Sequence, residues 1–324
     1  MKVTIVGAGL SGLMAARTLI DSGHQVVLFD KGRSPGGRLA TRRIGNACVD
    51  HGAQFFTTRD PAFAALVQQW SDAGVAYEWC RGFATADAAD ADADGNCDGF
   101  ARYAVHGGMN ALAKHLADGL DVRCNSLVFG IGRRDAGWRV TLDDASVTDS
   151  DALVVTCPLP QTFSLLFTAE VAMPEALWRT DYDKTLTLLA LLDRSGAVPY
   201  PGGLQGDAVF TFVGDNRAKG ISAEPALTFH ANAIWSDAHW NEPPASTLDA
   251  LTELARPWFG DAEVLERQLK RWRFATPRSI WPEPCWQPEG VHTLAVAGDA
   301  FSGPRVEGAA LSGIAAARAV MSAR

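Results

Sequence analysis

The strongest constraint on the fold lies at the start of the sequence. An apolar, β-branched run over residues 2–6 leads directly into Gly7-Ala8-Gly9-Leu10-Ser11-Gly12. A helical pattern follows over residues 13–21, and a second apolar run over residues 25–29 ends at Asp30. The order strand, glycine turn, helix, strand and acid predicts a dinucleotide-binding unit.

Each residue of this pattern has a physical task. Gly7 permits the tight turn, Gly9 lets the backbone approach a pyrophosphate, and Gly12 lets the helix pack close to the strand. The start of the helix offers free N–H groups and the positive end of its dipole to phosphates. Asp30 is expected to accept hydrogen bonds from the ribose of an adenosine.

A basic, glycine-rich loop follows the acid, with the sequence Lys31-Gly32-Arg33-Ser34-Pro35-Gly36-Gly37-Arg38. Its position directly after a ribose-binding acid favours binding over the alternative of a plain surface loop. We therefore expect Lys31 and the Gly36-Gly37-Arg38 turn to approach a second phosphate or a flat ring.

The end of the chain returns to nucleotide chemistry. A buried strand is predicted over residues 293–297, Gly298-Asp299 follows it, and Arg305-Val306 begins a helix of small residues. Asp299 can accept hydrogen bonds from a ribityl chain. The start of the helix can stabilise the negative charge that a reduced flavin carries at N1 and O2.

Composition narrows the class of protein. The chain has 324 residues and 47% hydrophobic residues, which is enough for two domains. Its net charge of -8 argues against nucleic-acid and anionic-membrane surfaces. No segment is long and apolar enough to span a bilayer, and Gly7, Gly9 and Gly12 interrupt any signal peptide. We expect neither nucleic-acid nor membrane partners.

The six cysteines are scattered and form no CxxC pair, so we expect no metal site. They are typical of reduced thiols in a cytoplasmic protein. Residues 84–99 mix small and acidic residues and predict a solvated loop. Alternating aspartates there also resemble a calcium loop, but no bidentate glutamate follows at the required distance.

Along the rest of the chain, Asp60-Pro61 predicts a helix start, and the helix is expected to end near residue 73. A hairpin is predicted around residues 133–137, and residues 151–158 predict a buried parallel strand that returns to the first sheet. Further predicted elements are a helix from Met109, strands over residues 120–124, 185–192, 209–213 and 226–233, and a helix over residues 246–259 capped by Ser246 or Thr247.

These elements predict an α/β fold, with a Rossmann-type FAD-binding domain and a discontinuous, mixed-sheet α+β substrate domain. The FAD-binding domain is expected to take residues 1–60, 100–158 and 285–324. The substrate domain is expected to take residues 61–99 and 159–284. The late tryptophans either line a pocket or pack the second sheet: Trp235, Trp240, Trp258, Trp272, Trp281 and Trp286.

Several of these segments together resemble FAD-dependent oxidoreductases of the flavin amine oxidase superfamily, and among them the bacterial renalases. The resemblance covers essentially the whole chain. It is carried by the glycine turn, Gly36-Gly37-Arg38, the run from Asp50 to Thr57, Gly107-Gly108-Met109, Asp215-Asn216-Arg217, residues 271–275 and residues 305–309. Asp30 stands where many flavoproteins have Glu.

The resemblance implies two domains, one that binds non-covalent FAD and one that covers the flavin. It implies oxidation of misreduced dihydro isomers of NAD(P)H, with O2 as electron acceptor and NAD(P)+ and hydrogen peroxide as products. The expected FAD-binding residues are Gly7, Gly9, Gly12, Asp30, Lys31, Gly36, Gly37, Arg38, the backbone of Val128, Gly298, Asp299, Arg305 and Val306.

Five residues are candidates for the substrate face: Gln54, Phe56, Asn216, His230 and Arg273. His51 and His106 can be catalytic or can serve as structural hydrogen-bonding groups. Two other functions stay open, namely a flavin-dependent amine or amino-acid oxidase and a flavin redox sensor without turnover. A dihydropyridine donor needs little acid–base help, and no residue pattern marks an amine cage, which favours the dihydronicotinamide substrate.

Overall fold

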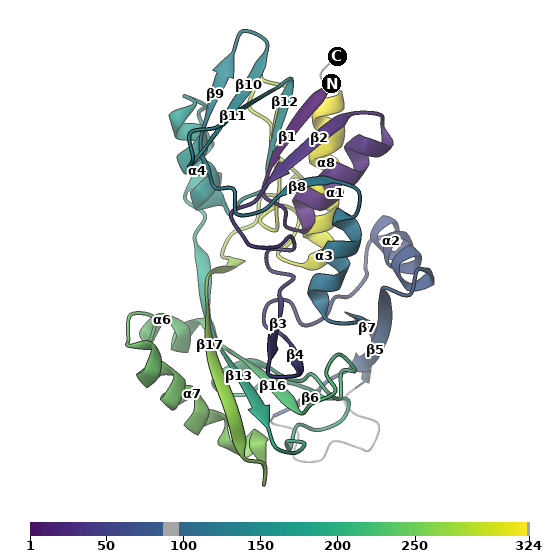
Figure 1. Cartoon of the computed structure of the whole chain (residues 1–324), viewed down its shortest axis with the longest axis vertical. Coiled ribbons are helices and arrows are strands. Elements are labelled where there is room, and N and C mark those ends of the chain that lie inside the picture. Colours follow the sequence, from purple (N-terminus) through teal and green to yellow (C-terminus); the bar gives the residue numbers. More distant parts are fainter. Residues whose placement is uncertain (87–96, 323–324) are drawn as a thin grey trace. The chain divides into compact units, whose positions relative to one another are not determined.

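The computed structural model describes residues 1–86 and 97–322 and divides into two compact units. Unit 1 comprises Met1–Arg38, Ala113–Asp181 and Thr276–Arg324, and unit 2 comprises Leu39–Leu112 and Tyr182–Ala275. The colours of Figure 1 show that each unit collects segments from distant parts of the sequence. The predicted α/β class with a second, mixed sheet is confirmed.

These compact units divide the chain differently from the predicted domains. Residues 39–60 and 100–112 lie in unit 2, and residues 159–181 and 276–284 lie in unit 1. Packing explains the first difference, because Ile44 and Val49 share a buried cluster with Leu189 of the second sheet.

Unit 1 is built on a parallel sheet in which β1 and β12 are central. The apolar run of β12 is buried along its whole length, as predicted for a strand covered on both faces. It pairs in parallel with β1 on one side and with β18 on the other. The strand order is β18 (Leu294–Val296), β12 (Ala152–Val155), β1 (Lys2–Val6), β2 (Gln25–Phe29), β8 (Asp121–Arg123).

Two helices from opposite ends of the chain pack side by side in unit 1, α1 (Leu10–Asp21) and α8 (Val306–Met321) (Figure 1). Small residues make the close approach possible. A Cβ atom on Gly313 would lie 2.0 Å from the carbonyl oxygen of Ser11. The Ser11 hydroxyl donates to the carbonyl oxygen of Ala309 at 2.7 Å. The helix after the glycine turn and the helix near the end of the chain therefore pack together in one layer.

An antiparallel sheet completes the strands of unit 1, and its β9–β10 hairpin confirms the turn predicted around residues 133–137. Its strands are β9 (Val128–Arg134), β10 (Gly137–Leu142) and β11 (Val147–Ser150). The remaining helices are α4 (Leu159–Thr168), α5 (Glu175–Trp178) and α3 (Met109–Ala117), which crosses the boundary between the units.

Unit 2 is built on a six-stranded mixed sheet. One of its faces packs against α7 (Pro244–Phe259), where Leu188 and Phe229 of the sheet meet Leu251 and Phe259 of the helix. The strand order is β17 (Val264–Pro277), β13 (Tyr182–Leu192), β16 (Ala226–Ala231), β15 (Phe210–Asp215), β14 (Gly203–Gln205), β6 (Ala84–Thr85).

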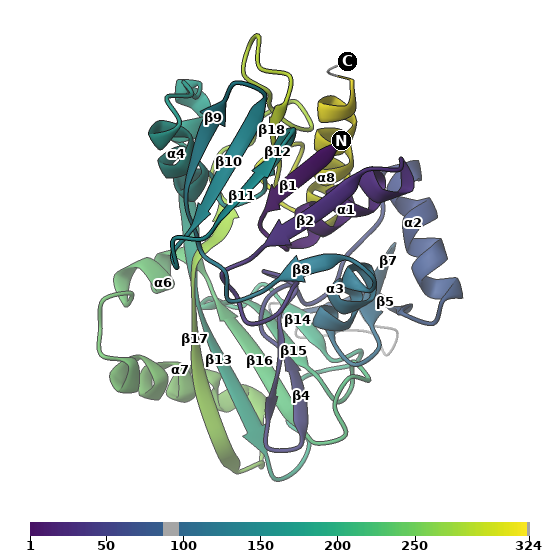
Figure 2. The ribbon, with the colours of Figure 1, turned by 45° about the horizontal axis from the view of Figure 1, so that its top comes forward.

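The other face of this sheet carries the hairpin of β3 (Thr41–Ile44) and β4 (Ala47–Asp50). Figure 2 shows α7 on one side of β13 and β16 and the hairpin on the other. The chain after β4 is therefore held against the six-stranded sheet. The remaining elements of unit 2 are α2 (Pro61–Asp72), β5 (Ala76–Gly82), β7 (Cys97–Val105) and α6 (Ala233–Ala238).

Of two predicted helix starts, the structure confirms one and contradicts the other. The Asp60 carboxylate accepts the backbone N–H of Ala62 at 2.7 Å, which confirms it as the N-cap of α2. The predicted cap of α7 at Ser246 or Thr247 is wrong, because the helix already begins at Pro244, whose fixed φ suits the first turn. Of the predicted acidic loop, residues 87–96 lie outside the described part of the chain.

Candidate functional site

The glycine turn of unit 1 has the geometry that its pattern predicts. Gly7 has a φ of +105°, a conformation that side chains rarely adopt. A Cβ atom on Gly12 would lie 2.0 Å from the carbonyl oxygen of Gly7, whereas one on Gly9 would meet nothing within 4 Å. Gly12 is therefore required by packing, and Gly9 borders open space that a ligand can fill.

Asp30 closes the turn from the second strand. Its carboxylate oxygens accept the backbone N–H groups of Ala8 at 2.7 Å and of Gly32 at 2.6 Å. A carboxylate has about four lone-pair sites, so both oxygens keep acceptor capacity for ribose hydroxyls. The chain after Asp30 then returns to the turn, where Gly36 forms a bridge to Gly9. Lys31, in contrast, is exposed.

The two ends of the chain are joined by an ion pair between Arg38 and Asp299. The guanidinium donates to both carboxylate oxygens, at 2.5 and 2.7 Å, a bidentate geometry that fixes both side chains. Beside it, the N–H of Gly298 donates to the hydroxyl of Ser312 in α8. Gly37 lies close to Gly9, since a Cβ atom on Gly37 would be 3.4 Å from the Cα of Gly9.

Both long helices of unit 1 begin without a side-chain cap, α1 at Gly9 and α8 at Arg305. Such starts leave backbone N–H groups and the positive end of the dipole for a ligand. Val306 opens α8, and Val128 opens β9, where its side chain is buried. The open space at Gly9, the acid at Asp30 and the uncapped helix starts fit a dinucleotide cofactor.

In unit 2 the segment from Asp50 to Gln54 is held by side chains of the six-stranded sheet. The Asp50 N–H donates to the side-chain oxygen of Asn216 at 3.1 Å. The Asp50 carbonyl oxygen accepts from the Thr228 hydroxyl at 2.7 Å and from the side-chain amide of Gln54 at 2.9 Å. The backbone of this segment therefore has a fixed position on the sheet.

The side chain of Asp50 is the centre of a buried polar cluster. Its carboxylate accepts the N–H of Met109 at 2.8 Å, the hydroxyl of Thr41 and the ammonium of Lys219 at 2.6 Å. The side chain of Lys219 is 1% exposed and that of Asp50 is fully buried. A buried charge is tolerated only when it is paired and fully hydrogen-bonded, and each partner here satisfies the other.

Directly after Asp50, the ring of His51 stacks on that of Trp272 from β17. The ring centroids lie 5.4 Å apart at an angle of 22°, and the Trp272 indole N–H donates to the His51 carbonyl oxygen at 2.7 Å. We call this pair the aromatic platform. Beside it, the side chains of Gln54 and His230 are 3.5 Å apart. Uncharged polar side chains therefore lie beside the stacked pair.

Both histidines are neutral at physiological pH. The pKa of His51 is lowered to about 3, mainly by burial and further by the positive charges of Lys270 and Arg42. Burial also lowers the pKa of His230 to about 4, and a hydrogen bond to the backbone of His51 opposes part of that shift. His51, His230 and Gln54 therefore offer uncharged imidazoles and an amide rather than a strong base.

Of the five predicted substrate-face residues, Gln54 and His230 are brought together by the structure. Asn216 is 1% exposed and uses its amide N–H groups on the Ala226 carbonyl and the Thr228 hydroxyl. It therefore holds the Asp50 segment rather than facing open space.

The other two predicted residues lie elsewhere in unit 2. Phe56 is 3% exposed and packs among Phe63, Trp70 and Tyr103 beneath α2. Arg273 is exposed and directly follows Trp272 in β17, and successive side chains of a strand point to opposite faces. The side chain of Arg273 therefore points away from the aromatic platform.

Sequence reasoning missed Lys219, left His51 undecided, and named Trp272 only among the late tryptophans that either line a pocket or pack the second sheet. Trp272 lies in a long edge strand that was not predicted, and its contact with His51 spans 221 residues of sequence. The one local signal for Lys219 is its position, four residues after the end of the buried strand β15. The tryptophans mostly pack rather than line a site, since Trp235, Trp240 and Trp258 lie against the core beside α7.

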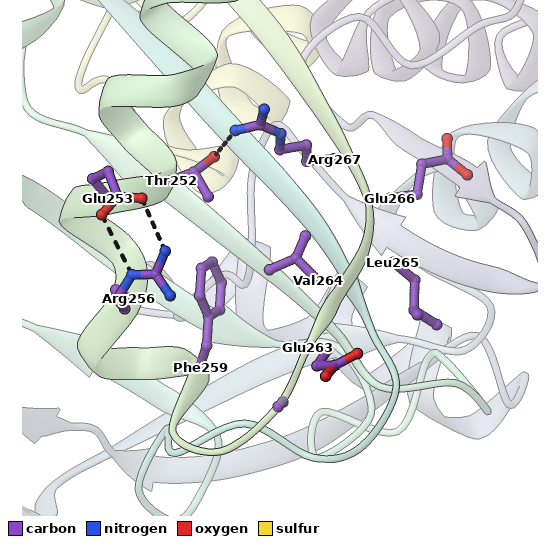
Figure 3. A pocket seen from close by; sticks show the side chains of 10 residues that line it. Thr252, Glu253, Arg256, Phe259, Glu263, Val264, Leu265, Glu266 and Arg267 are labelled. Atoms are coloured by element: carbon purple, nitrogen blue, oxygen red, sulfur yellow. Dashed lines mark hydrogen bonds and ion pairs between the residues drawn. The ribbon is translucent and has the colours of Figure 1, made fainter.

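A separate hollow of about 490 Å³ lies between α7 and β17 (Figure 3). Thr252 and Arg256 of α7 and Val264 and Arg267 of β17 are among its lining residues. Its two arginines already have partners, Arg256 with Glu253 and Arg267 with Asp249 and the hydroxyl of Thr252. None of the predicted site residues lines it. It is therefore not the candidate site.

Two features are absent from the described residues, a cluster of metal-ligating side chains and a helix that could span a membrane. No three metal-ligating side chains of His, Cys, Asp or Glu gather among them. None of their helices has the length and apolar character needed to cross a bilayer.

Family profiles match both parts of the chain. A profile of the NAD(P)-binding Rossmann-like domain matches residues 5–70. A profile described as flavin containing amine oxidoreductase matches residues 69–321, which is most of the chain.

Individual relatives agree with the profiles. Renalase of Mus musculus is 26% identical over 172 residues, which are 51% of this chain and 49% of renalase. Putrescine oxidase of Kocuria rosea is 36% identical over 67 residues, which are 21% of this chain and 14% of that enzyme. The aligned part thus spans about half, or less, of these curated relatives.

Solved structures extend the similarity over the whole length. The structure of cyclohexylamine oxidase from Brevibacterium oxydans superposes with a TM-score of 0.77 over 99% of both chains, at 16% sequence identity. At this identity the likeness establishes the fold.

Proposed function

The chain belongs to the flavin containing amine oxidoreductase family, and on this premise we propose that it is an FAD-dependent oxidase of misreduced dihydro isomers of NAD(P)H. In this reaction the substrate loses a hydride and leaves as NAD(P)+, and O2 takes the electrons and becomes hydrogen peroxide. The resemblance to renalases carries this choice of substrate, and the partial similarity to mouse renalase supports it.

The observation that most favours this substrate is that the imidazoles of His51 and His230, at and beside the aromatic platform, are uncharged. Oxidation of an amine begins with loss of a proton from an ammonium group, whose pKa lies near 10. An imidazole whose pKa is about 4, such as that of His230, is a weak acceptor for that proton. Removal of hydride from a dihydropyridine needs no base, because the loss itself restores the aromatic ring.

In this proposal the chain's own groups bind and orient the donor ring. The aromatic platform offers a flat, rigid surface, since the indole of Trp272 is anchored to the His51 carbonyl. Gln54 and His230 supply uncharged polar groups at its edge. Asn216 and Asp50 act as positioning residues, because they hold the backbone that carries His51 and Gln54.

We propose FAD as the cofactor, held without a covalent bond by unit 1. Bound flavin supplies the electron acceptor for the hydride. The open backbone at Gly9 would meet the pyrophosphate, and Asp30 would meet the adenosine ribose. The further cofactor-binding residues are Gly7, Gly12, Lys31, Gly36, Gly37, Arg38, Val128, Gly298, Asp299, Arg305 and Val306.

Amine oxidation is the second candidate. The family match and the similarity to putrescine oxidase favour it. A flavin sensor without turnover has less support, since the family is one of oxidoreductases.

Anaerobic stopped-flow mixing of the oxidised holoenzyme separates the candidates. We expect rapid bleaching of the flavin by 2-dihydro-NAD(P) and none by putrescine or cyclohexylamine. Bleaching by an amine, with none by the dihydronicotinamide isomers, would transfer the assignment to amine oxidation. Release of all yellow colour on denaturation would support non-covalent FAD, and colour that stays with the precipitated protein would contradict it.

A further inference from the structure

The side-chain amide of Gln54 has a fixed orientation in unit 2. Its nitrogen donates to the carbonyl oxygens of Asp50 at 2.9 Å and of Gly52 at 3.2 Å. Turning the amide over would replace this donor by an oxygen and bring three acceptor oxygens together. The atom that faces Nε2 of His230, at 3.5 Å, is therefore the same amide nitrogen.

This contact determines which ring nitrogen of His230 carries the proton. An amide nitrogen donates hydrogen bonds and accepts none. A proton on Nε2 would point at another donor, so Nε2 is the nitrogen without a proton. In the neutral ring the proton then lies on Nδ1.

The backbone of His51 provides the acceptor that this tautomer needs. A hydrogen bond between the His230 ring and that backbone acts to raise the pKa of His230, so the backbone atom is an acceptor. It is the carbonyl oxygen, because the His51 N–H donates to the Ala40 carbonyl oxygen at 2.9 Å. The same carbonyl oxygen accepts the indole N–H of Trp272 at 2.7 Å. The rings of His230 and Trp272 therefore hold His51 from two strands of the sheet.

The groups around His230 do not favour a second proton on its ring. Its partners in the neighbouring strands are Thr187 of β13 and Phe212 of β15, and neither carries a charge. The ammonium of Lys219, which is paired with a buried carboxylate, lowers the pKa of His230 together with burial. A further titratable neighbour, His51, is uncharged.

We propose that Gln54 is a positioning residue that keeps His230 in its neutral, Nδ1-protonated form beside the ring that the enzyme oxidises. This proposal rests on the proposed function. Loss of a hydride, with its two electrons, to bound flavin turns the neutral dihydropyridine into a pyridinium cation. A positive imidazolium at the edge of the aromatic platform would repel that developing charge. The amide nitrogen of Gln54 opposes the imidazolium, because it offers no acceptor for a proton on Nε2.

Nitrogen-15 NMR of the histidine rings in the FAD-bound protein reads the tautomer without turnover. The signals of His230 are identified by their loss in His230→Asn. We expect a proton on Nδ1 and none on Nε2 at pH 7. A ring protonated on Nε2, alone or together with Nδ1, would overturn the proposal, and this measurement needs no variant at Gln54.

The variant Gln54→Glu tests the role of the amide directly. A carboxylate places an acceptor at Nε2 while the His51 carbonyl still faces Nδ1, so the imidazolium should be the main form of His230 at pH 7. The matched control Gln69→Glu puts the same charge on an exposed position of α2 and should leave His230 neutral. A neutral His230 in Gln54→Glu, or an imidazolium in the control, would contradict the role of Gln54.

Anaerobic stopped-flow mixing with 2-dihydro-NAD measures the consequence for the reaction. At pH 7 the limiting rate of flavin reduction should be about ten-fold lower in Gln54→Glu than in the parent and the control. It should rise toward the parent's rate as the pH increases and the imidazolium loses its proton. An imidazolium with an unchanged rate would overturn the electrostatic role. If 2-dihydro-NAD does not reduce the parent, the proposed function fails, and the NMR result still decides whether Gln54 sets the tautomer.

Discussion

The candidate sites of unit 1 and unit 2 are built from different chemical groups. Unit 1 offers backbone, at a glycine turn whose Gly9 borders open space and at two helix starts without side-chain caps. Unit 2 offers side chains, with the aromatic platform held by hydrogen bonds from distant strands. Backbone recognition depends on the absence of side-chain atoms at a few positions, whereas side-chain recognition depends on a network that supports each group.

The largest expected effect comes from placing one methyl group in the glycine turn. In Gly12→Ala the new Cβ would lie 2.0 Å from the Gly7 carbonyl oxygen, so helix α1 must shift and FAD binding should be lost. Gly9→Ala is the matched control, because its Cβ meets no protein atom within 4 Å. Its apoprotein should unfold at the parent's temperature while its FAD affinity falls.

Calorimetry of the apoproteins and titration with FAD measure these two effects separately. Equal melting temperatures for Gly12→Ala and the parent would contradict the close packing inferred for this turn. Unchanged FAD affinity in Gly9→Ala would show that the pyrophosphate lies elsewhere.

The supporting network of unit 2 can be broken at its buried ion pair. Lys219→Met leaves the carboxylate of Asp50 buried without its counter-charge, which should lower the free energy of unfolding by about 3–5 kcal/mol. The double variant Lys219→Met with Asp50→Asn removes both charges and should recover part of the loss. Urea unfolding of the parent, the single variant and the double variant measures the loss of stability and its recovery. A single variant as stable as the parent would exclude the network as a support of the platform.

Acid should destabilise unit 2 through its neutral histidines. The pKa of His51 is about 3 and that of His230 about 4, against an ordinary value of 6.5, so only the unfolded state takes up their protons at mildly acidic pH. The contribution of these histidines to the free energy of unfolding should be fully present at pH 7. It should fall as the pH drops from about 6.5 toward 4, by about 1.4 kcal/mol per pH unit for each histidine.

Free energies of unfolding at several pH values test this dependence. His230→Asn should make the dependence shallower, and the control His292→Asn, at an exposed position of unit 1, should leave it unchanged. An identical pH dependence in His230→Asn and the parent would show that this imidazole is protonated in the folded protein.

A smaller effect is expected at Asp30, where a side chain assists the backbone site of unit 1. Asp30→Ala removes the acceptor for the Ala8 N–H and for a ribose hydroxyl, which should weaken FAD binding by about 1.5–3 kcal/mol. The reduction rate of the FAD-saturated variant should equal that of the parent. FAD affinity equal to that of the parent would show that the Asp30 carboxylate has another role.

The contrast between the units also explains what the sequence could predict. The elements around the dinucleotide motif follow from local patterns, and β1 and β2 match the predicted bounds because their apolar runs end at a glycine turn and an acid. β17 was not predicted, because this edge strand mixes charged and apolar residues without a simple alternation. Charged residues at an edge limit pairing with other chains and hide the strand pattern.

The site of unit 2 was only partly predictable for a related reason. Gln54 and His230 lie together, but Phe56 belongs to an aromatic core and Asn216 to the support of Asp50. The ion pair between Asp50 and Lys219 joins residues 169 positions apart. No local pattern reports such a contact, since it depends on how the strands are ordered in the sheet.

The most direct test of the proposed chemistry is the pH dependence of the limiting rate of anaerobic flavin reduction by 2-dihydro-NAD. A donor that loses hydride without a base needs no titrating group, and both histidines are already neutral above pH 6. We expect rapid reduction whose limiting rate is constant from about pH 6 to pH 9. A limiting rate that rises with pH as a base is deprotonated, or no reduction at any pH, would contradict it.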